Sequence, residues 1–407
     1  MSMRYKGGVI SATSPTVTPP VDGEGGSASG IWSLKTQAQY AGSGEWPKPI
    51  LDKELYSSGK GLYGALGTSS IVNTSSPVQI GAETIWNALS TNFETAMATK
   101  TDGTLWYWGR GNGGRSGTGT ENPATKSSPV QIGALTNWSI IRVMAEDCVA
   151  VKTDGTFWSW GTNSYGQLGQ NNKTNYFSPV QVGSLTTWST VATSLNDGVF
   201  ALKTDGTLWS WGKGGSSQGQ LGHSDEVYRS SPVQIGSDTW SYIAAGNTTV
   251  GGIRTSGSLW MWGNGGNGAL GDGYEENASS PIQVGALTTW ASLAVGLKAA
   301  LAIKTDGTLW AWGLNSKGPL GINSTINKSS PVQVGAQTTW KKPSVGRYSS
   351  IVTKTDGTMW SWGANAQGEL GRTNLAYNSS PIQVGAATNW GFATSTQDEG
   401  SSLFRTG

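Results

Sequence analysis

The sequence has one cysteine, Cys148, and one histidine, His223, in 407 residues. A single cysteine excludes an intrachain disulfide, so the fold must hold without one. Metal sites use clustered His, Cys or carboxylate ligands, and no such cluster occurs in the sequence. We therefore expect neither a metal site nor a bound cofactor.

Charged residues are also scarce, at 13% of the chain with a net charge of +2. Nucleic-acid binding takes clustered Lys and Arg that neutralise phosphates, and no such run is present. No apolar run of signal-peptide length follows Arg4 and Lys6, and none approaches a membrane span. We expect a protein made in a cytoplasm and not exported by the usual route, with no nucleic-acid partner and no membrane insertion.

Glycine and tryptophan, in contrast, are abundant, with 60 and 21 residues. Glycine at this level is typical of turns or of disorder, but disordered segments are poor in aromatic residues. The combination predicts a packed, turn-rich β protein.

The chain is built from a repeat with a period of about 50 residues. A Ser-Pro-Val/Ile-Gln-Ile/Val-Gly phrase occurs seven times, and a tryptophan follows each proline by eight or nine residues. The prolines are Pro77, Pro129, Pro179, Pro232, Pro281, Pro331 and Pro381, and the tryptophans are Trp86, Trp138, Trp188, Trp240, Trp290, Trp340 and Trp390. Between them the chain reads Lys-Thr-Asp-Gly-Thr-Leu-Trp-x-Trp-Gly with small variations.

Each unit predicts four short strands. In one unit these are residues 188–192, 200–203, 207–211 and the Pro-Val-Gln-Val segment, and an Asp-Gly turn joins the second strand to the third. Alternation in Leu208-Trp209-Ser210-Trp211 puts both tryptophans on one face of the third strand. Four strands per unit, repeated radially, is the design of a β-propeller.

The two ends of the repeat region each predict half of such a unit. Residues 54–59 match the strand that leaves the Asp-Gly turn, and residues 401–407 match the strand that enters it. Joined, they complete one composite blade, so the sequence predicts an all-β, seven-bladed propeller over residues 51–407 with no exposed sheet edge.

The tryptophans are predicted to pack between blades. Burying one removes about 150–250 Å² from water, a gross gain of about 4–6 kcal/mol at about 25 cal/mol per Å². The alternative is a platform on which sugars stack, and we favour packing.

The repeat resembles the regulator of chromosome condensation repeat family over residues 51–407. The resemblance implies a seven-bladed propeller that works as a protein-binding surface, as in a bacterial relative that inhibits β-lactamase. The eukaryotic namesake is a nucleotide-exchange factor bound to chromatin. This chain has no basic arm and no long wedge-like insertion, so we do not expect exchange activity.

Residues 1–50 lie outside the repeat and predict an extended leader, with a short helix near residues 31–40. The segments Tyr5–Thr13 and Gly30–Leu34, followed by Trp46-Pro47, resemble the leaders of bacteriophage tail and fibre proteins. The resemblance implies docking onto a neighbouring virion subunit. Candidate anchoring residues are Tyr5, Val9, Ile10, Ile31, Trp32 and Leu34. The alternative is a loose tail or a strap over the propeller.

No arrangement of catalytic residues is recognisable. His223 stands in a polar loop with no nucleophile or orienting partner, and we interpret it as solvated. Asp102, Asp154, Asp205, Asp306 and Asp356 recur, but each belongs to a hairpin turn that favours Asp. The Gly111–Gly119 stretch lacks the residues of a phosphate loop, and Cys148 is expected to be a small buried apolar residue. We therefore predict that the chain is not an enzyme.

Loops on a rigid scaffold usually carry specificity, and Tyr and Arg are frequent interface residues. In the loops between Trp-Gly and Ser-Pro, the candidate binding residues are Tyr176, Phe177, Tyr228, Arg229, Tyr274, Glu275, Lys328 and Tyr377. The loops between strands one and two, which we place on the opposite face, carry Asn92, Phe93, Glu94, Glu146, Asp147, Asp197, Arg347, Tyr348, Asp398 and Glu399. The sequence does not choose between the two faces.

The leading hypothesis is a phage virion structural protein, a fibre, tail-associated or decoration component in a homo-oligomeric assembly. Its partners would be other virion proteins through residues 1–50 and a host-surface protein or glycan through the propeller loops. The alternative is a bacterial protein-binding propeller of inhibitor or scaffold type with no virion role. A glycan-degrading enzyme lacks any paired-carboxylate signal.

Overall fold

The computed structural model describes residues 17–18, 27–28, 53–92, 94–215, 218–394 and 401–406. The chain divides into two units, Met1–Asp52 and Lys53–Gly407. In the first, β1 (Val17–Thr18) pairs with β2 (Ser27–Ala28). The predicted helix near residues 31–40 and the candidate anchoring residues all lie outside the described residues, namely Tyr5, Val9, Ile10, Ile31, Trp32 and Leu34.

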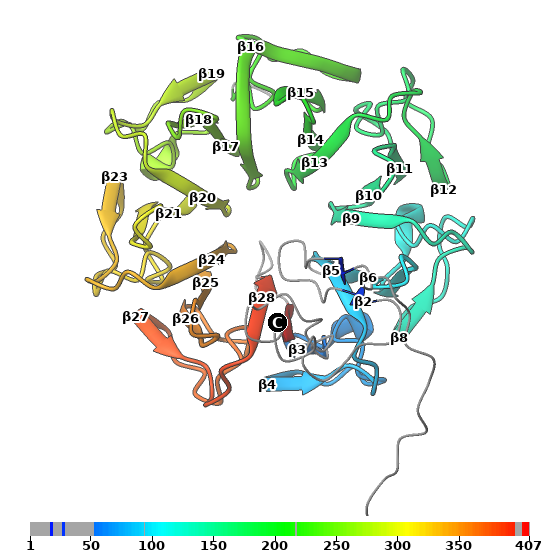
Figure 1. The fold of residues 1–407 in the computed structure, drawn as a ribbon, viewed down its shortest axis with the longest axis horizontal. Helices are drawn as coiled ribbons and strands as arrows, with labels where there is room; N and C mark the ends of the chain where they lie inside the picture. Colours follow the sequence, from blue (N-terminus) through cyan, green and yellow to red (C-terminus); the bar gives the residue numbers. More distant parts are fainter. Residues whose placement is uncertain are drawn as a thin grey trace, which may run out of the picture. The chain divides into compact units, whose positions relative to one another are not determined.

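The second unit is all-β, and its sheets are arranged radially in a propeller-like fold (Figure 1). Its described residues form five four-stranded antiparallel sheets and one seven-stranded sheet. Helix is limited there to three single turns, η1 (Leu62–Gly64), η2 (Asn112–Gly114) and η3 (Gly266–Gly268).

The first two four-stranded sheets consist of β5 (Trp86–Thr91), β6 (Thr95–Lys100), β7 (Leu105–Gly109) and β8 (Lys126–Gln131), and of β9 (Trp138–Val143), β10 (Asp147–Lys152), β11 (Phe157–Gly161) and β12 (Tyr176–Gln181). The next two consist of β20 (Trp290–Val295), β21 (Ala299–Lys304), β22 (Leu309–Gly313) and β23 (Lys328–Gln333), and of β24 (Trp340–Val345), β25 (Ser349–Lys354), β26 (Met359–Gly363) and β27 (Asn378–Gln383). The fifth consists of β28 (Trp390–Thr394), β29 (Ser401–Thr406), β3 (Leu55–Gly59) and β4 (Thr74–Gln79), in that order. The seven-stranded sheet consists of β13 (Trp188–Thr193), β14 (Gly198–Lys203), β15 (Thr207–Gly212), β16 (Arg229–Ala245), β17 (Thr249–Arg254), β18 (Leu259–Gly263) and β19 (Ala278–Gln283).

The seven-stranded sheet arises because β16 serves two repeat units. Its first part pairs with β15, where Val233 lies opposite Ser210, and its last part pairs with β17, where Trp240 lies opposite Arg254. The connection from Pro232 to Trp240 is one residue shorter than in the other units, and the strand runs through it without the usual turn.

The Asp-Gly turns are built by local hydrogen bonds, as predicted. Asp306 Oδ1 accepts from the backbone N–H of Thr308 at 2.9 Å and from its hydroxyl at 2.6 Å. The Thr308 hydroxyl in turn accepts from Trp310 Nε1 at 3.0 Å. Gly307 has φ +78°, and a Cβ there would lie 2.0 Å from the backbone oxygen of Thr338, so only glycine fits. The recurring aspartates are thus turn residues, which confirms that interpretation.

The second tryptophan of each third strand packs between sheets. Trp312 is fully buried, and its Nε1 donates to the backbone oxygen of Ala269 in the preceding unit at 3.1 Å. Five other indoles make the same bond, namely Trp108, Trp160, Trp211, Trp262 and Trp362. The prediction of packing between blades is confirmed for these rings, and a sugar platform is wrong for them because they have no exposed face.

The other two tryptophans of a unit hold a cation. Lys304 Nζ lies 3.6 Å from the ring centroid of Trp310 and 5.0 Å from that of Trp290. Equivalent contacts are made by Lys100, Lys152, Lys203, Arg254 and Lys354. Aromatic faces attract a desolvated cation, so each clamp ties the first strand of a unit to its second and third.

The ends of the repeat region meet in one sheet. Strand β29 pairs antiparallel with β3, so that Ser402 lies opposite Ser58 and Arg405 lies opposite Leu55. Figure 1 shows the red β28 and the blue β4 at opposite edges of this sheet. We call β28, β29, β3 and β4 the composite sheet. Its register agrees with the pairing predicted from the sequence.

The packing of Trp312 yields a first prediction. Trp312→Ala should lower the free energy of unfolding by about 3–5 kcal/mol, because it leaves a large cavity. Trp312→Phe should cost about 1–3 kcal/mol, because the carbonyl of Ala269 loses its donor. Urea denaturation followed by circular dichroism measures both. The exposed Tyr274→Ala is the control, and a W312A variant as stable as this control would contradict the proposed packing.

Candidate binding face

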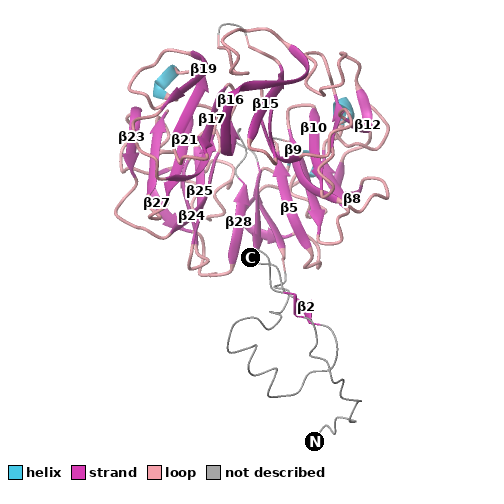
Figure 2. Ribbon diagram, turned by 45° about the horizontal axis from the view of Figure 1, so that its top comes forward, coloured by secondary structure: helices cyan, strands magenta, loops and turns pink. Residues whose placement is uncertain are grey.

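The two sets of variable loops lie at the same end of the strands. Figure 2 shows the strands of the second unit running between two rims of loops. The loop after the third strand begins beside the loop between strands one and two: the backbone N–H of Arg110 donates to Glu94 O at 2.8 Å, and that of Lys213 donates to Asp197 O at 2.9 Å. Placing these loops on opposite faces was wrong, because successive reversals of a meander alternate between its ends. We call the shared end the loop face.

Four of the eight predicted binding residues are exposed on this face. They are Tyr228, Tyr274, Glu275 and Tyr377, and the tyrosines Tyr274 and Tyr377 are 66% and 60% exposed. Such rings offer a large, rigid contact area to a partner. Tyr228 is held edge-on against Tyr165, with ring centroids 5.4 Å apart.

The other four predicted residues, Tyr176, Phe177, Arg229 and Lys328, are half-buried. Phe177 packs on the preceding unit, where a Cβ on Gly114 would lie 2.3 Å from its ring. Arg229 is engaged by both carboxylate oxygens of Asp225, at 2.9 and 2.7 Å. Both side chains therefore have partners within the chain, and their role as contact residues stays a prediction.

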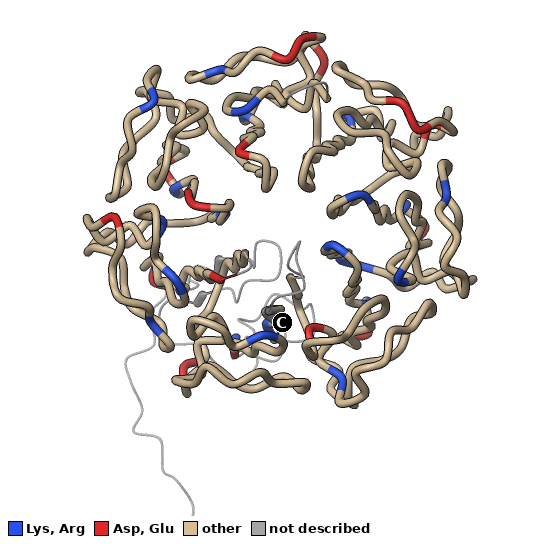
Figure 3. Tube along the Cα trace, turned by 180° about the vertical axis from the view of Figure 1, so that it is seen from behind, with Lys and Arg blue, Asp and Glu red and all other residues tan. Residues whose placement is uncertain are grey.

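Charged groups on the loop face pair within one unit, and one of them also contacts the neighbouring unit. Glu94 binds Arg110 at 2.9 Å and Arg115 at 3.3 Å, and the Arg110 guanidinium lies 5.0 Å from the centre of the Tyr63 ring. The bond from Glu94 raises the pKa of Arg110, whereas burial lowers the pKa of Arg115. Figure 3 shows basic and acidic positions interspersed around the unit. Phe93, Asp398 and Glu399 lie outside the described residues.

One acidic group of this face is buried. Asp147 begins β10, is fully buried, and has no hydrogen-bond partner for either carboxylate oxygen. Burial, reinforced by the charge of Asp197, raises the pKa of Asp147 well above its usual range. Burial also raises the pKa of Asp197 to about 6. The sequence suggested an exposed loop residue here, although Thr95 and Thr249 at the equivalent position could have indicated a buried one.

Neither His223 nor Cys148 has the surroundings of a reactive group. His223 is half-buried and its Nε2 lies 2.9 Å from the Ser210 hydroxyl, so its interpretation as a solvated loop residue was wrong. Burial lowers the pKa of His223 to about 4, which leaves the ring neutral at pH 7. Cys148 is fully buried, as predicted, and burial raises the pKa of its thiol.

The described part of the chain has neither a metal-binding cluster nor a membrane-spanning helix. No group of three or more His, Cys, Asp or Glu side chains there could hold a metal ion. No helix there is long and apolar enough to cross a membrane.

Part of the chain matches the regulator of chromosome condensation (RCC1) repeat. Residues 154–195, 205–252, 256–303 and 306–352 match that repeat, and a second form of it matches residues 290–318. The RCC1 domain-containing protein RUG3, mitochondrial, from Arabidopsis thaliana is 29% identical over 58% of this chain and 55% of its own length. The human E3 ubiquitin-protein ligase HERC2 is 28% identical over 58% of this chain, but over only 5% of its own length. The chain thus spans about half of one relative and a small part of the other.

Solved structures share the fold. Human WBSCR16 superimposes with a TM-score of 0.77 at 17% identity, covering 87% of this chain and 98% of its own. Prp20p from Saccharomyces cerevisiae, which binds Gsp1p and histones, has a TM-score of 0.74 at 17% identity, covering 88% and 92%. At such identities the likeness establishes an RCC1-like propeller fold only.

The buried carboxyl group yields the second prediction. Asp147→Thr should raise the free energy of unfolding at pH 7.5 by about 1–3 kcal/mol, because it removes an unsatisfied buried acid. At the equivalent position the Thr249 hydroxyl donates to Asn264 O at 2.8 Å, so threonine suits the site.

The same variant should alter the pH dependence of stability. A carboxyl group whose folded pKa is raised contributes stability below its unfolded pKa, and loses it as pH rises toward the folded value. The wild type should therefore lose stability from about pH 4 to 6 through Asp197, and further above that through Asp147. Thermal unfolding between pH 4 and 8 measures the loss, with Glu275→Gln as the exposed control. A lower Tm of D147T than of wild type at pH 7.5 would count against this account.

Proposed function

We propose that this RCC1-repeat propeller is a protein-binding component of a bacteriophage virion, anchored by residues 1–50 and carrying no catalytic activity. The observation that carries the binding role is the loop face. There, six units contribute both of their variable loops to the same end of a scaffold built from uniform units. Binding residues on a propeller usually lie in such loops, because the side chains of the blades are buried against neighbouring blades.

The binding role has support from proteins of the same fold. Prp20p binds Gsp1p and histones, and yeast RCC1 (Prp20) has been solved bound to Kap60. Those partners belong to those proteins. What supports the present proposal is that an RCC1-like ring serves as a protein-binding surface, and that Tyr274 and Tyr377 are exposed on the loop face here.

We further propose that the ring has seven blades and is closed by the composite sheet. If the seven-stranded sheet counts as two blades joined through β16, the six large sheets give seven blades. The composite sheet then forms the blade in which the two ends of the repeat region pair. A closed ring has no unpaired edge that could recruit another chain.

The virion role rests on the resemblance of residues 4–13 and 30–34 to the leaders of phage tail and fibre proteins. An extended leader joined to a rigid binding module would let one end dock into the particle while the loop face meets a host-surface protein or glycan. Capsid and tail genes beside the coding sequence would favour this role over a bacterial scaffold or inhibitor.

The anchoring role is tested by deleting residues 1–45. The truncated protein should keep the thermal unfolding transition of the full chain, because the repeats begin after it. It should fail to join particles assembled in its presence, as measured by immunoblotting of purified virions. Full-length protein provides the control, and incorporation of the truncated protein at the full-length level would refute the anchor.

Closure is tested by deleting residues 401–407, which removes β29 from the middle of the composite sheet. Strands β28 and β3 would each lose their partner, so the apparent Tm should fall by about 10 °C or more and the protein should aggregate at lower temperature. Differential scanning calorimetry with light scattering measures both. The control removes Gly407 alone, and equal transitions in the two deletions would disprove closure.

A further inference from the structure

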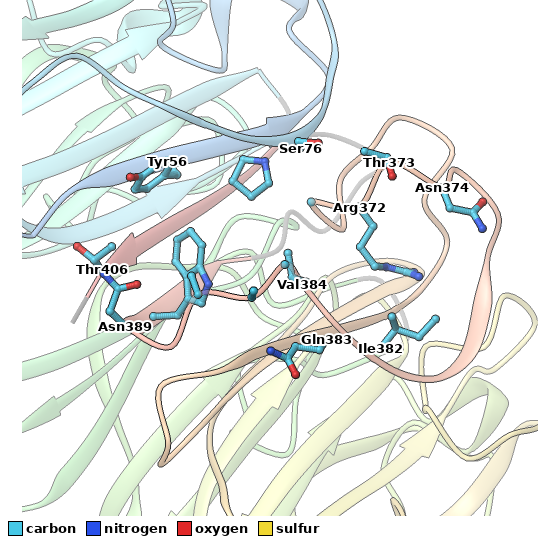
Figure 4. A pocket seen from close by; sticks show the side chains of 16 residues that line it. Tyr56, Ser76, Arg372, Thr373, Asn374, Ile382, Gln383, Val384, Asn389 and Thr406 are labelled. Atoms are coloured by element: carbon cyan, nitrogen blue, oxygen red, sulfur yellow. The ribbon is translucent and has the colours of Figure 1, made fainter.

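A groove of about 680 Å³ opens between the composite sheet and the sheet β24–β27. Figure 4 shows Tyr56 and Thr406 at one end, and Arg372, Ile382 and Asn374 at the other. Pro77, Val384 and Trp390 are further apolar parts of its lining. The groove therefore combines apolar walls with a single charged group among its described lining residues, the guanidinium of Arg372.

The neighbouring groove shows what is unusual here. It lies one unit back, has a volume of about 420 Å³, and is lined by Ile322, Val334, Trp340, Trp360 and Pro381, the counterparts of Arg372, Val384, Trp390, Tyr56 and Pro77. The larger groove thus has a smaller ring and an added charge. The next sheet also contributes less to it: a Cβ on Gly321 would lie 2.7 Å from Trp362 Nε1, whereas one on Gly371 would meet only Pro77 and Val384, at 3.3 Å.

The guanidinium of Arg372 lacks hydrogen bonds that its burial demands. Its Nε and Nη2 atoms are shielded from solvent and have no hydrogen-bond partner. None of the ion pairs formed among the described residues includes Arg372. Burial lowers its pKa, which the charge of Glu369 only partly offsets. A buried N–H without an acceptor is costly, so the site favours a ligand carboxylate toward which the Arg372 side chain turns these two donors.

Polar side chains at the same position of other units are satisfied by their own sheets. Gln170 Nε2 donates to the backbone oxygen of Gln181 at 3.1 Å, and His223 Nε2 lies 2.9 Å from the Ser210 hydroxyl. Arg372 makes no such bond. Its free donors are therefore a property of this groove and not of the repeat.

We propose that this groove binds an acidic segment of a partner polypeptide, in which an Asp or Glu carboxylate pairs with Arg372 and an adjacent apolar side chain packs on Pro77 and Trp390. A carboxylate matches the forked donors of a guanidinium and is strongest where water is excluded. Peptide amides of the segment would find partners in Gln383 and Asn389. The Trp390 ring is buried and the Tyr56 ring meets it edge to face at 76°, so the two do not form a shared flat surface on which a sugar could stack. The inference rests on the proposed protein-binding function and assigns it a specific groove beside the composite sheet.

The test uses the full chain on an array of capped nonapeptides. Each peptide has Asp or Glu at the centre and varied apolar residues beside it, and a matched array has Asn or Gln at the centre. Acidic peptides should be retained over their amide counterparts, and isothermal titration of the best one should give binding at least tenfold weaker for Arg372→Ile. That substitution installs the residue of the neighbouring groove, so its thermal stability should equal or exceed that of wild type.

A double variant, R372I with I322R, keeps the net charge and moves the guanidinium into the smaller groove. It should bind as weakly as R372I. That result would show that binding needs the guanidinium in the larger groove and not only a positive charge on the protein. Equal binding by wild type and R372I, or equal retention of the acidic and amide arrays, would overturn the proposal. So would Arg372-dependent binding of an oligoglucuronate with no peptide binding. Because R372I leaves residues 1–50 untouched, it should still join particles, and the anchoring test gives an independent answer.

Discussion

The propeller depends on one contact, which six of the units make: the second indole of the third strand is inserted between its own sheet and the one before it. The ring contributes apolar area, and its N–H donates to a backbone oxygen about 43 residues earlier, as from Trp312 to Ala269. The contact therefore fixes both the distance and the rotation between consecutive sheets. A chain with one cysteine cannot form an intrachain disulfide, and a single repeat unit cannot bury its hydrophobic face alone.

The position of every other feature of a unit follows from that contact. The first tryptophan of the third strand, such as Trp310, donates from its ring nitrogen to the threonine of the Asp-Gly turn. The lysine that ends the second strand lies over the face of the same ring. Turn, cation and indole thus form one connected block, repeated with few changes. Such a block leaves little freedom to the blades, and variation is confined to the loop ends and to the seam where the two ends of the repeat region meet.

The sequence predicted the parts that are local or periodic. Asp306, Gly307 and Trp310 could be placed because turn chemistry and strand alternation are encoded within a few residues. The pairing of residues 55–59 with 401–406 could be predicted because each segment resembles one strand of the complete units. Failures came where a neighbouring unit decides the outcome. Phe177 is of a residue type that is common at interfaces, yet its ring fills the space beside Gly114. Asp147 is of a residue type that is common in exposed loops, yet it is buried at the start of a strand.

The residue after each Leu-Gly or Ser-Gly shows how a uniform scaffold gains individual sites. The seven units place Thr68, Thr118, Gln170, His223, Asp272, Ile322 and Arg372 there. The backbone at these points is nearly the same, so the side chains can differ without disturbing the indole contacts that hold neighbouring sheets together. Where the side chain finds a hydrogen-bond partner in its own sheet, as His223 does, it has no unsatisfied group to offer a ligand. Where it does not, as at Arg372, the unsatisfied donors and the wider groove occur together. Both arise at the one seam whose facing strand has serine, Ser58, in place of the indole.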